Sequence, residues 1–144
     1  MSTLSRDGMR RLLLAIWFLF LIANLGVVLF LYLSDWIGSD NFKQALNEIN
    51  LSYAPYLGVI LAFYWSERRS RPKPAGAAGS EDRTAFYLAV ACTLLWNTIL
   101  SVFFFRLLFL SGTVEDSLAR IADLRGIFTW FLAGSLGLYF GTRP

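Results

Sequence analysis

The fold of this chain is decided by the stretch LLLAIWFLFLIANLGVVLFLYL, residues 12–33. It contains no charged side chain, and it is long enough to cross the hydrocarbon core of a bilayer, which takes about 20 apolar residues in an α-helix. Arg6, Arg10 and Arg11 precede a full-length span, whereas a cleavable signal has a short apolar core followed by small residues. We therefore expect residues 12–33 to form a transmembrane helix and not a signal peptide.

Three more apolar stretches follow, and we expect membrane spans at about 12–33, 51–66, 85–110 and 126–141. A flexible, basic linker at residues 67–83 separates the two halves. Hydrophobic residues make up 56% of the chain, above the roughly 45–50% of soluble domains. The sequence thus predicts an all-α integral membrane protein, with one four-helix transmembrane domain over residues 1–144.

The second and fourth spans are short, and an amphipathic stretch precedes each of them. Apolar residues recur there at the three- and four-residue steps of one helix face. They are Phe42, Leu46 and Ile49 before the second span, and Val114, Leu118, Ile121 and Leu124 before the fourth. We expect both helices to begin outside the membrane, capped by Asp40 and by a capping box of Thr113 and Asp116. Pro55 either kinks the second helix or marks the start of a separate one.

The distribution of Lys and Arg predicts the orientation, because cytoplasmic segments retain cations. Nine lie before the first span, in the linker or at the carboxyl end: Arg6, Arg10, Arg11, Arg68, Arg69, Arg71, Lys73, Arg83 and Arg143. Only Lys43, Arg120 and Arg125 lie on the other side. We expect a multi-pass protein of the cell membrane with both termini in the cytoplasm. The linker 67–83 would contact anionic lipid headgroups, or alternatively a cytoplasmic protein partner.

The two halves show a possible duplication. A shift of 75 residues aligns Leu57 with Leu132 and Glu48 with Asp123 without gaps. If the duplication is real, the halves are parallel repeats related by an axis along the membrane normal. The alternative is chance, because apolar segments draw on few residue types.

The same shift aligns two sets of small residues at four-residue spacing, and these let helix backbones approach closely in lipid. The sets are Gly58, Ala62 and Ser66 in the second helix, and Ala133, Gly137 and Gly141 in the fourth. We expect them to pack helices together, either within one chain or between copies of the chain.

One face of the third helix is polar, because Thr93, Asn97 and Ser101 recur every four residues near mid-membrane. Asn24 lies at a similar depth in the first helix. Amides in hydrocarbon must face protein or water. One interpretation is a hydrogen-bond clamp, for example between Asn24 and Asn97. The other is a water-lined path through the bundle or through a ring of subunits.

Arg106, near the outer end of the third helix, is expected to extend to the headgroups or to pair with Glu115 or Asp116. No carboxylate is expected within a span, which argues against proton-coupled transport.

Catalysis is not expected. The chain has no histidine, which removes the usual neutral-pH base and the commonest metal ligand. Its single cysteine, Cys92, forms neither an intramolecular disulfide nor a two-cysteine redox motif. We see no metal-spaced cluster, phosphate-binding loop or other cofactor signature, and no nucleic-acid-binding pattern.

Two functions remain. The first is a homo-oligomeric ion channel or membrane-depolarising pore, formed on a symmetry axis because four short helices provide too little wall for a wide path. The second is a non-catalytic accessory or anchoring subunit of a larger membrane complex.

Overall fold

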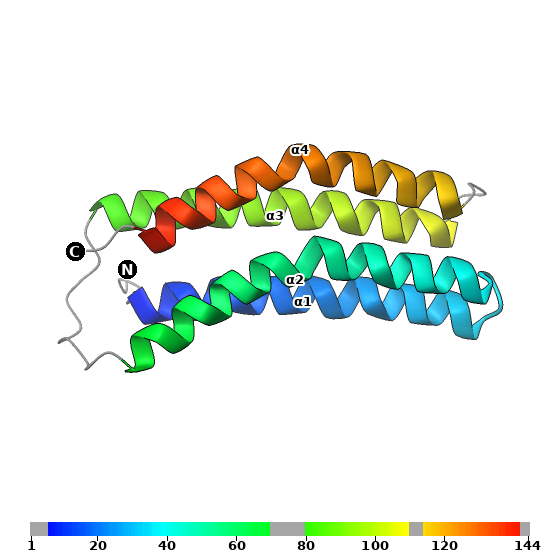
Figure 1. Ribbon diagram of the computed structural model, residues 1–144, viewed down its shortest axis with the longest axis horizontal. Coiled ribbons are helices and arrows are strands. Elements are labelled where there is room, and N and C mark those ends of the chain that lie inside the picture. The colour runs from blue at the N-terminus through cyan, green and yellow to red at the C-terminus, as the bar shows by residue number, and fades with distance from the viewer. Residues whose placement is uncertain (1–5, 70–79, 110–113, 142–144) are drawn as a thin grey trace.

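The computed structural model describes residues 6–69, 80–109 and 114–141, which form four long helices (Figure 1). They are α1 (Arg6–Leu33), α2 (Ser39–Arg69), α3 (Ser80–Phe109) and α4 (Val114–Gly141). The helices run side by side in alternating directions (Figure 1). We call the end where α1 and α3 finish and α2 and α4 begin the outer end, and the opposite one the inner end. The described ranges contain no β-strand.

Three of these helices are long and apolar enough to cross a membrane: Gly8–Leu33 in α1, Arg83–Leu107 in α3 and Val114–Phe140 in α4. α2 has a comparable length, but its outer half carries Asp40, Lys43 and Glu48 and lowers its hydropathy. The prediction of helices that are long and apolar enough to cross a membrane is confirmed for three of them, and the described residues are all-helical apart from their connections. Crossing by α2 remains a prediction.

The packing of the helices leaves two diagonal pairs. α1 packs against α2 and α3, and α4 packs against α3 and α2, whereas the backbones of α1 and α4, and those of α2 and α3, do not approach closely within the described residues. At the inner end the guanidinium of Arg10 in α1 lies over the ring of Phe140 in α4, 5.8 Å from its centroid. A two-fold axis through the centre of the bundle would instead place α1 diagonal to α3. The predicted repeat about an axis along the membrane normal is therefore not confirmed.

The turn between α1 and α2 corrects one predicted cap. Asp35 adopts a left-handed backbone with a φ of 57°, and the N–H of Trp36 reaches back to the carbonyl of Leu31 at 3.0 Å, which closes α1. The first bond of α2 runs from the N–H of Phe42 to the carbonyl of Gly38 at 3.0 Å. Asp40 thus lies inside the first turn and does not cap it. A carboxylate there still favours the positive end of the helix dipole.

Two other helix boundaries were predicted, at Pro55 and at the capping box of Thr113. α2 continues through Pro55 as a single helix, so no separate membrane helix begins there. Thr113 of the proposed capping box lies outside the described residues, as does most of the linker.

Large aromatic side chains fill the core. Trp17 of α1 stacks on Tyr56 and meets Tyr53 edge-on, with ring centroids 5.1 and 5.7 Å apart. Trp96 of α3 stacks on Phe128 of α4 at 5.3 Å. Both tryptophans are fully buried, so they join α1 to α2 and α3 to α4 within one chain.

Candidate functional site

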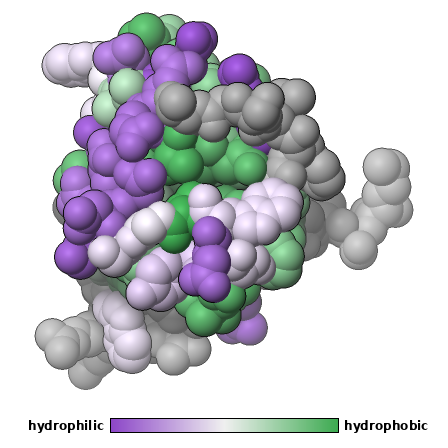
Figure 2. Space-filling view, turned by 90° about the vertical axis from the view of Figure 1, so that its right-hand side faces the viewer, coloured by the Kyte–Doolittle hydropathy of each residue, from purple (hydrophilic) through white to green (hydrophobic). Residues whose placement is uncertain are grey.

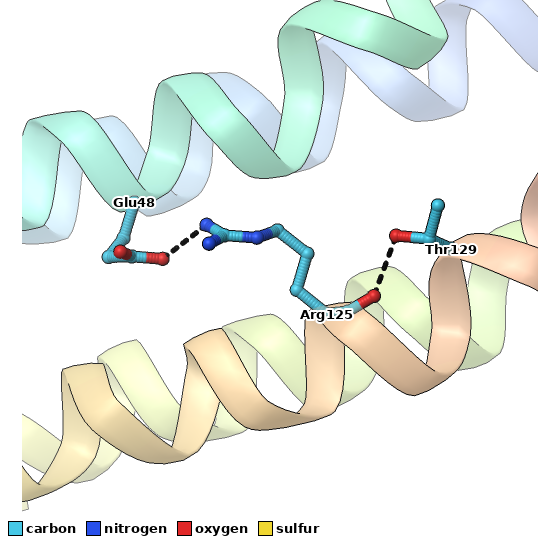
Figure 3. A network of polar contacts seen from close by, with 3 residues as sticks. All are labelled: Glu48, Arg125 and Thr129. Atoms are coloured by element: carbon cyan, nitrogen blue, oxygen red, sulfur yellow. Dashed lines mark hydrogen bonds and ion pairs between the residues drawn. The ribbon is translucent and has the colours of Figure 1, made fainter.

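A buried ion pair joins α2 to α4. Nη1 of Arg125 donates to Oε2 of Glu48 at 2.5 Å, and the side chains are 23% and 11% exposed (Figure 3). The hydroxyl of Thr129 donates to the backbone carbonyl of Arg125 at 2.6 Å, one turn further along α4 (Figure 3). Glu48 has no other hydrogen-bond partner within the described part of the chain. Its charge is therefore neutralised by Arg125 alone.

The positions of the two residues along their helices explain why they meet. α2 and α4 both begin at the outer end, Glu48 lies nine residues after Ser39, and Arg125 lies eleven residues after Val114. At 1.5 Å per residue, both side chains are about 15 Å from the start of their helices. This pair was not predicted from the sequence, although Glu48 and Arg125 lie at nearly equal distances from the starts of two helices that run in the same direction.

Glu48 lies before the predicted span 51–66, so its burial does not contradict the expectation that no carboxylate lies within a span. It lies inside the bundle beside Arg125, which belongs to the candidate span Val114–Phe140. Ionisable residues inside membrane bundles are costly and usually functional. The argument against proton-coupled transport remains a prediction.

The polar face of α3, formed by Thr93, Asn97 and Ser101, points toward the interior of the chain's own helical bundle. Thr93 and Asn97 are fully buried and Ser101 is half-buried. Nδ2 of Asn97 donates to the carbonyl of Thr93 at 2.8 Å, within the same helix. Thr93 and Asn97 therefore face neighbouring helices of the same chain, and a water-lined path along this face stays a prediction.

The expected clamp between Asn24 and Asn97 does not form. Nδ2 of Asn24 donates instead to the hydroxyl of Tyr53 at 2.7 Å, which joins α1 to α2. Both asparagines lie at similar depths, but their amide N–H groups are used by other acceptors. The expectation was right about burial and wrong about the partner.

Arg106 is half-buried, and none of its contacts is an ion pair with Glu115 or Asp116. Its Nε is buried with no hydrogen-bond partner in the structure. Asp116 pairs with Arg120 one turn along α4, at 3.1 Å. The ion-pair alternative for Arg106 was therefore wrong.

The predicted small-residue faces of α2 and α4 lie on the surface. Gly58, Ala62, Ala133 and Gly137 are exposed, and a Cβ added at Gly58 or Gly137 would meet no atom within 4 Å. The exposure of Ser66 and Gly141 is not described. Packing of these faces within one chain is thus contradicted, whereas packing between copies remains a prediction.

Two further features concern the cysteine and metal-ligating residues. Cys92 is a half-buried free thiol in α3. No group of His, Cys, Asp or Glu within the described ranges has the arrangement of a metal site.

Comparison with family models, curated proteins and solved structures found no match.

Proposed function

We propose that this chain is a subunit of a homo-oligomeric membrane protein that forms an ion-conducting pore, with four spans and cytoplasmic termini. The observation that carries the proposal is a polar surface on α2 and α4 at the level where α1 and α3 present apolar side chains. Viewed from the outer end, hydrophilic residues gather along one side of the molecule (Figure 2).

In the first hairpin, two contacts show which residues of α1 and α2 lie side by side at the same depth. Tyr32 stacks on Phe42 at 4.2 Å, and Asn24 bonds to Tyr53, so α2 residues 42–53 lie beside α1 residues 24–32. The exposed polar residues in this part of α2 are Lys43, Gln44, Asn47 and Asn50. α1 exposes Leu25, Leu29 and Phe30 over the same length.

In the second hairpin, a polar surface on α4 likewise lies beside an apolar surface on α3. Two contacts show which residues share a depth. Phe103 of α3 lines one surface groove with Arg120, Asp123 and Leu124 of α4, and Trp96 stacks on Phe128. α4 exposes Asp116, Arg120 and Asp123 in this outer half. α3 exposes Leu95, Val102 and Phe105.

In this proposal the outer halves of α2 and α4 lie within the membrane beside the spans of α1 and α3, in place of the expected start outside it. Lipid cannot solvate a polar and an apolar surface at the same depth. Charged and amide side chains facing hydrocarbon cost several kcal/mol each, whereas leucine and phenylalanine belong there. A ring of copies resolves the conflict when α1 and α3 face lipid and α2 and α4 face a shared axis. The polar outer halves then line a water-filled lumen.

The inner halves of α2 and α4 suit contact between copies around that axis. Gly58 and Ala62 continue the exposed face of α2 at four-residue steps, and Ala133 and Gly137 do the same on α4. Small residues permit the close backbone approach that drives helix association in lipid. The lumen would therefore be wide at the outer end and narrow at the inner end.

The lumen lining has more acidic than basic residues. Asp40, Asp116 and Asp123 are exposed on α2 and α4, against Lys43 and Arg120. An acidic mouth raises the local concentration of cations. A pore of this kind would favour cations over anions.

An accessory or anchoring subunit is the second candidate, and the exposed aromatic surface of α4 favours it. Trp130 and Phe131 are both largely exposed beyond the polar half of α4. A partner chain with a polar surface could cover α2 and α4 and take the place of the lumen. Such a protein would have no conductance of its own.

Ion flux through liposomes, together with the mass of the purified protein in detergent, tests the proposal. We expect a closed homo-oligomer that conducts cations, with flux reduced at least tenfold in Asn50→Leu, which lies on the proposed lumen. Val102→Leu on the lipid-facing side is the matched control and should conduct normally. A silent monomer would refute the pore and favour the accessory subunit.

A further inference from the structure

A surface groove lies between α3 and α4 near the outer end of the bundle. It has a volume of about 250 Å³, and the described residues that line it are Phe103, Arg120, Asp123 and Leu124. Pockets that hold whole drug-sized molecules have volumes of roughly 300–1,000 Å³, so this groove has room for only part of a larger ligand. Its lining combines two apolar side chains with one positive and one negative charge.

The groove lies close to the depth at which a membrane-spanning helix meets the lipid headgroups. Phe103 is four residues before Leu107, the last residue of the candidate span Arg83–Leu107. At 1.5 Å per residue, this is about 6 Å from the end of the span. Headgroups lie directly outside the hydrocarbon core, and long cationic side chains extend to meet them. A phospholipid beside α3 can therefore place its headgroup in the groove.

The two charged residues of the groove have hydrogen-bonding groups that the protein does not use. Nε of Arg120 donates to Asp116 at 3.1 Å, and the side chain of Arg120 is 57% exposed. Its two Nη groups form no hydrogen bond within the described part of the chain. Asp123 is exposed, and its carboxylate forms neither a hydrogen bond nor an ion pair there. The groove thus offers N–H donors on one side and carboxylate oxygens on the other.

Arg106 adds a second guanidinium one turn further toward the outer end. It lies three residues after Phe103, and residues at that spacing share one face of a helix. The side chain of Arg106 is half-buried, and its Nε is shielded from solvent without a hydrogen-bond partner. A buried N–H that stays unsatisfied is costly, and a phosphate oxygen is among the strongest acceptors for a guanidinium.

We propose that the groove between α3 and α4 binds the headgroup of a phospholipid that carries a primary amine, such as phosphatidylethanolamine. The phosphate accepts hydrogen bonds from Arg106 and Arg120, and the ammonium donates to the carboxylate of Asp123. Phe103 and Leu124 contact the first carbons of the acyl chains. This site lies within a single chain and does not depend on the proposed pore.

The balance of charge at the groove selects this class of headgroup. Arg106 and Arg120 contribute two positive charges, which Asp116 and Asp123 cancel. A zwitterionic headgroup satisfies both signs, whereas an anionic lipid brings an uncompensated negative charge toward Asp123. A choline headgroup is also zwitterionic, but its quaternary ammonium has no N–H and donates nothing to the carboxylate.

Thermal unfolding of the detergent-purified full chain tests the site, with added phosphatidylethanolamine, phosphatidylcholine or phosphatidylglycerol of identical acyl chains. A ligand that binds only the folded state raises the melting temperature. We expect phosphatidylethanolamine to raise it by about 5 °C more than either of the other two lipids. No rise, an equal rise with all three lipids, or the largest rise with phosphatidylglycerol would overturn the proposal.

Two variants separate the two ends of the headgroup. Asp123→Asn should lose the preference for phosphatidylethanolamine over phosphatidylcholine, because a neutral amide attracts the ammonium far less than a carboxylate does. Arg106→Gln should weaken the binding of both lipids about tenfold, because both carry the phosphate. Each response is measured from the variant's own melting temperature without lipid, so a change in stability does not affect it.

Lys43→Gln is the matched control, because it removes an exposed cation that pairs with Asp40 at the outer end of α2, away from the groove. It should keep the full response to phosphatidylethanolamine. A preference that survives in Asp123→Asn would contradict the assignment. So would a loss of binding in Lys43→Gln as large as that in Arg106→Gln.

Discussion

Replacing Arg125 with methionine should destabilise the folded chain more than any change to its exposed ion pairs. Met fills a similar volume but leaves Glu48 with no partner, and only 11% of that side chain is exposed. Removing one member of a buried ion pair typically costs about 3–5 kcal/mol, because the remaining charge stays desolvated. Glu48→Gln should cost less, about 1–3 kcal/mol, since the amide still accepts from Arg125.

The free energy of unfolding in mixed detergent micelles measures this effect. The double variant Glu48→Gln with Arg125→Met should be less destabilised than the sum of the single variants, by about 1–3 kcal/mol. Asp116→Asn is the control, because the Asp116–Arg120 pair is 55% and 57% exposed and should contribute no more than about 1 kcal/mol. A loss for Arg125→Met no larger than that for Asp116→Asn would show that the ion pair does not stabilise the bundle.

Three further outcomes follow from other contacts. Tyr53→Phe removes the acceptor of Asn24 and should cost about 0.6–2 kcal/mol in the same unfolding measurement; no loss would mean that the bond contributes nothing. Gly58→Leu and Gly137→Leu should leave the fold intact, because an added side chain meets open space, but should lower the mass of the assembly; unfolding of the monomer would contradict this. Glu115→Gln should lower the free energy of unfolding by no more than about 1 kcal/mol, because Glu115 lies in the first turn of α4 and loses only its interaction with the helix dipole; a loss of several kcal/mol would indicate an ion pair with Arg106.

The sequence predicted the helices well because their signals are local. The uncharged stretch 12–33 and the amphipathic run before residue 51 each report on one helix alone. Their lengths and directions follow without knowledge of any neighbour. The two-fold repeat depended on which helices lie diagonally, and alignment of sequence halves does not contain that information.

The site was predicted less well, because it depends on how each helix is rotated about its axis. Asn24 and Asn97 lie at similar depths, but the amide of Asn24 bonds to the hydroxyl of Tyr53 and not to Asn97. Glu48 and Arg125 were each assigned to a polar outer stretch, and their burial became visible only once α2 and α4 were placed side by side. The spacing of Gly58 and Ala62 identified a helix face but not what covers it.

The most direct test of the central claim is the reactivity of single cysteines toward a membrane-impermeant thiosulfonate, in a Cys92→Ala chain reconstituted into liposomes. We expect cysteines at Asn47 and Asn50 to react from the outer side, because α2 lines an aqueous lumen in the proposed pore. Cysteines at Leu29 and Val102, at comparable depth, should stay unreactive in lipid. Equal protection of all four positions would contradict a water-filled path along α2.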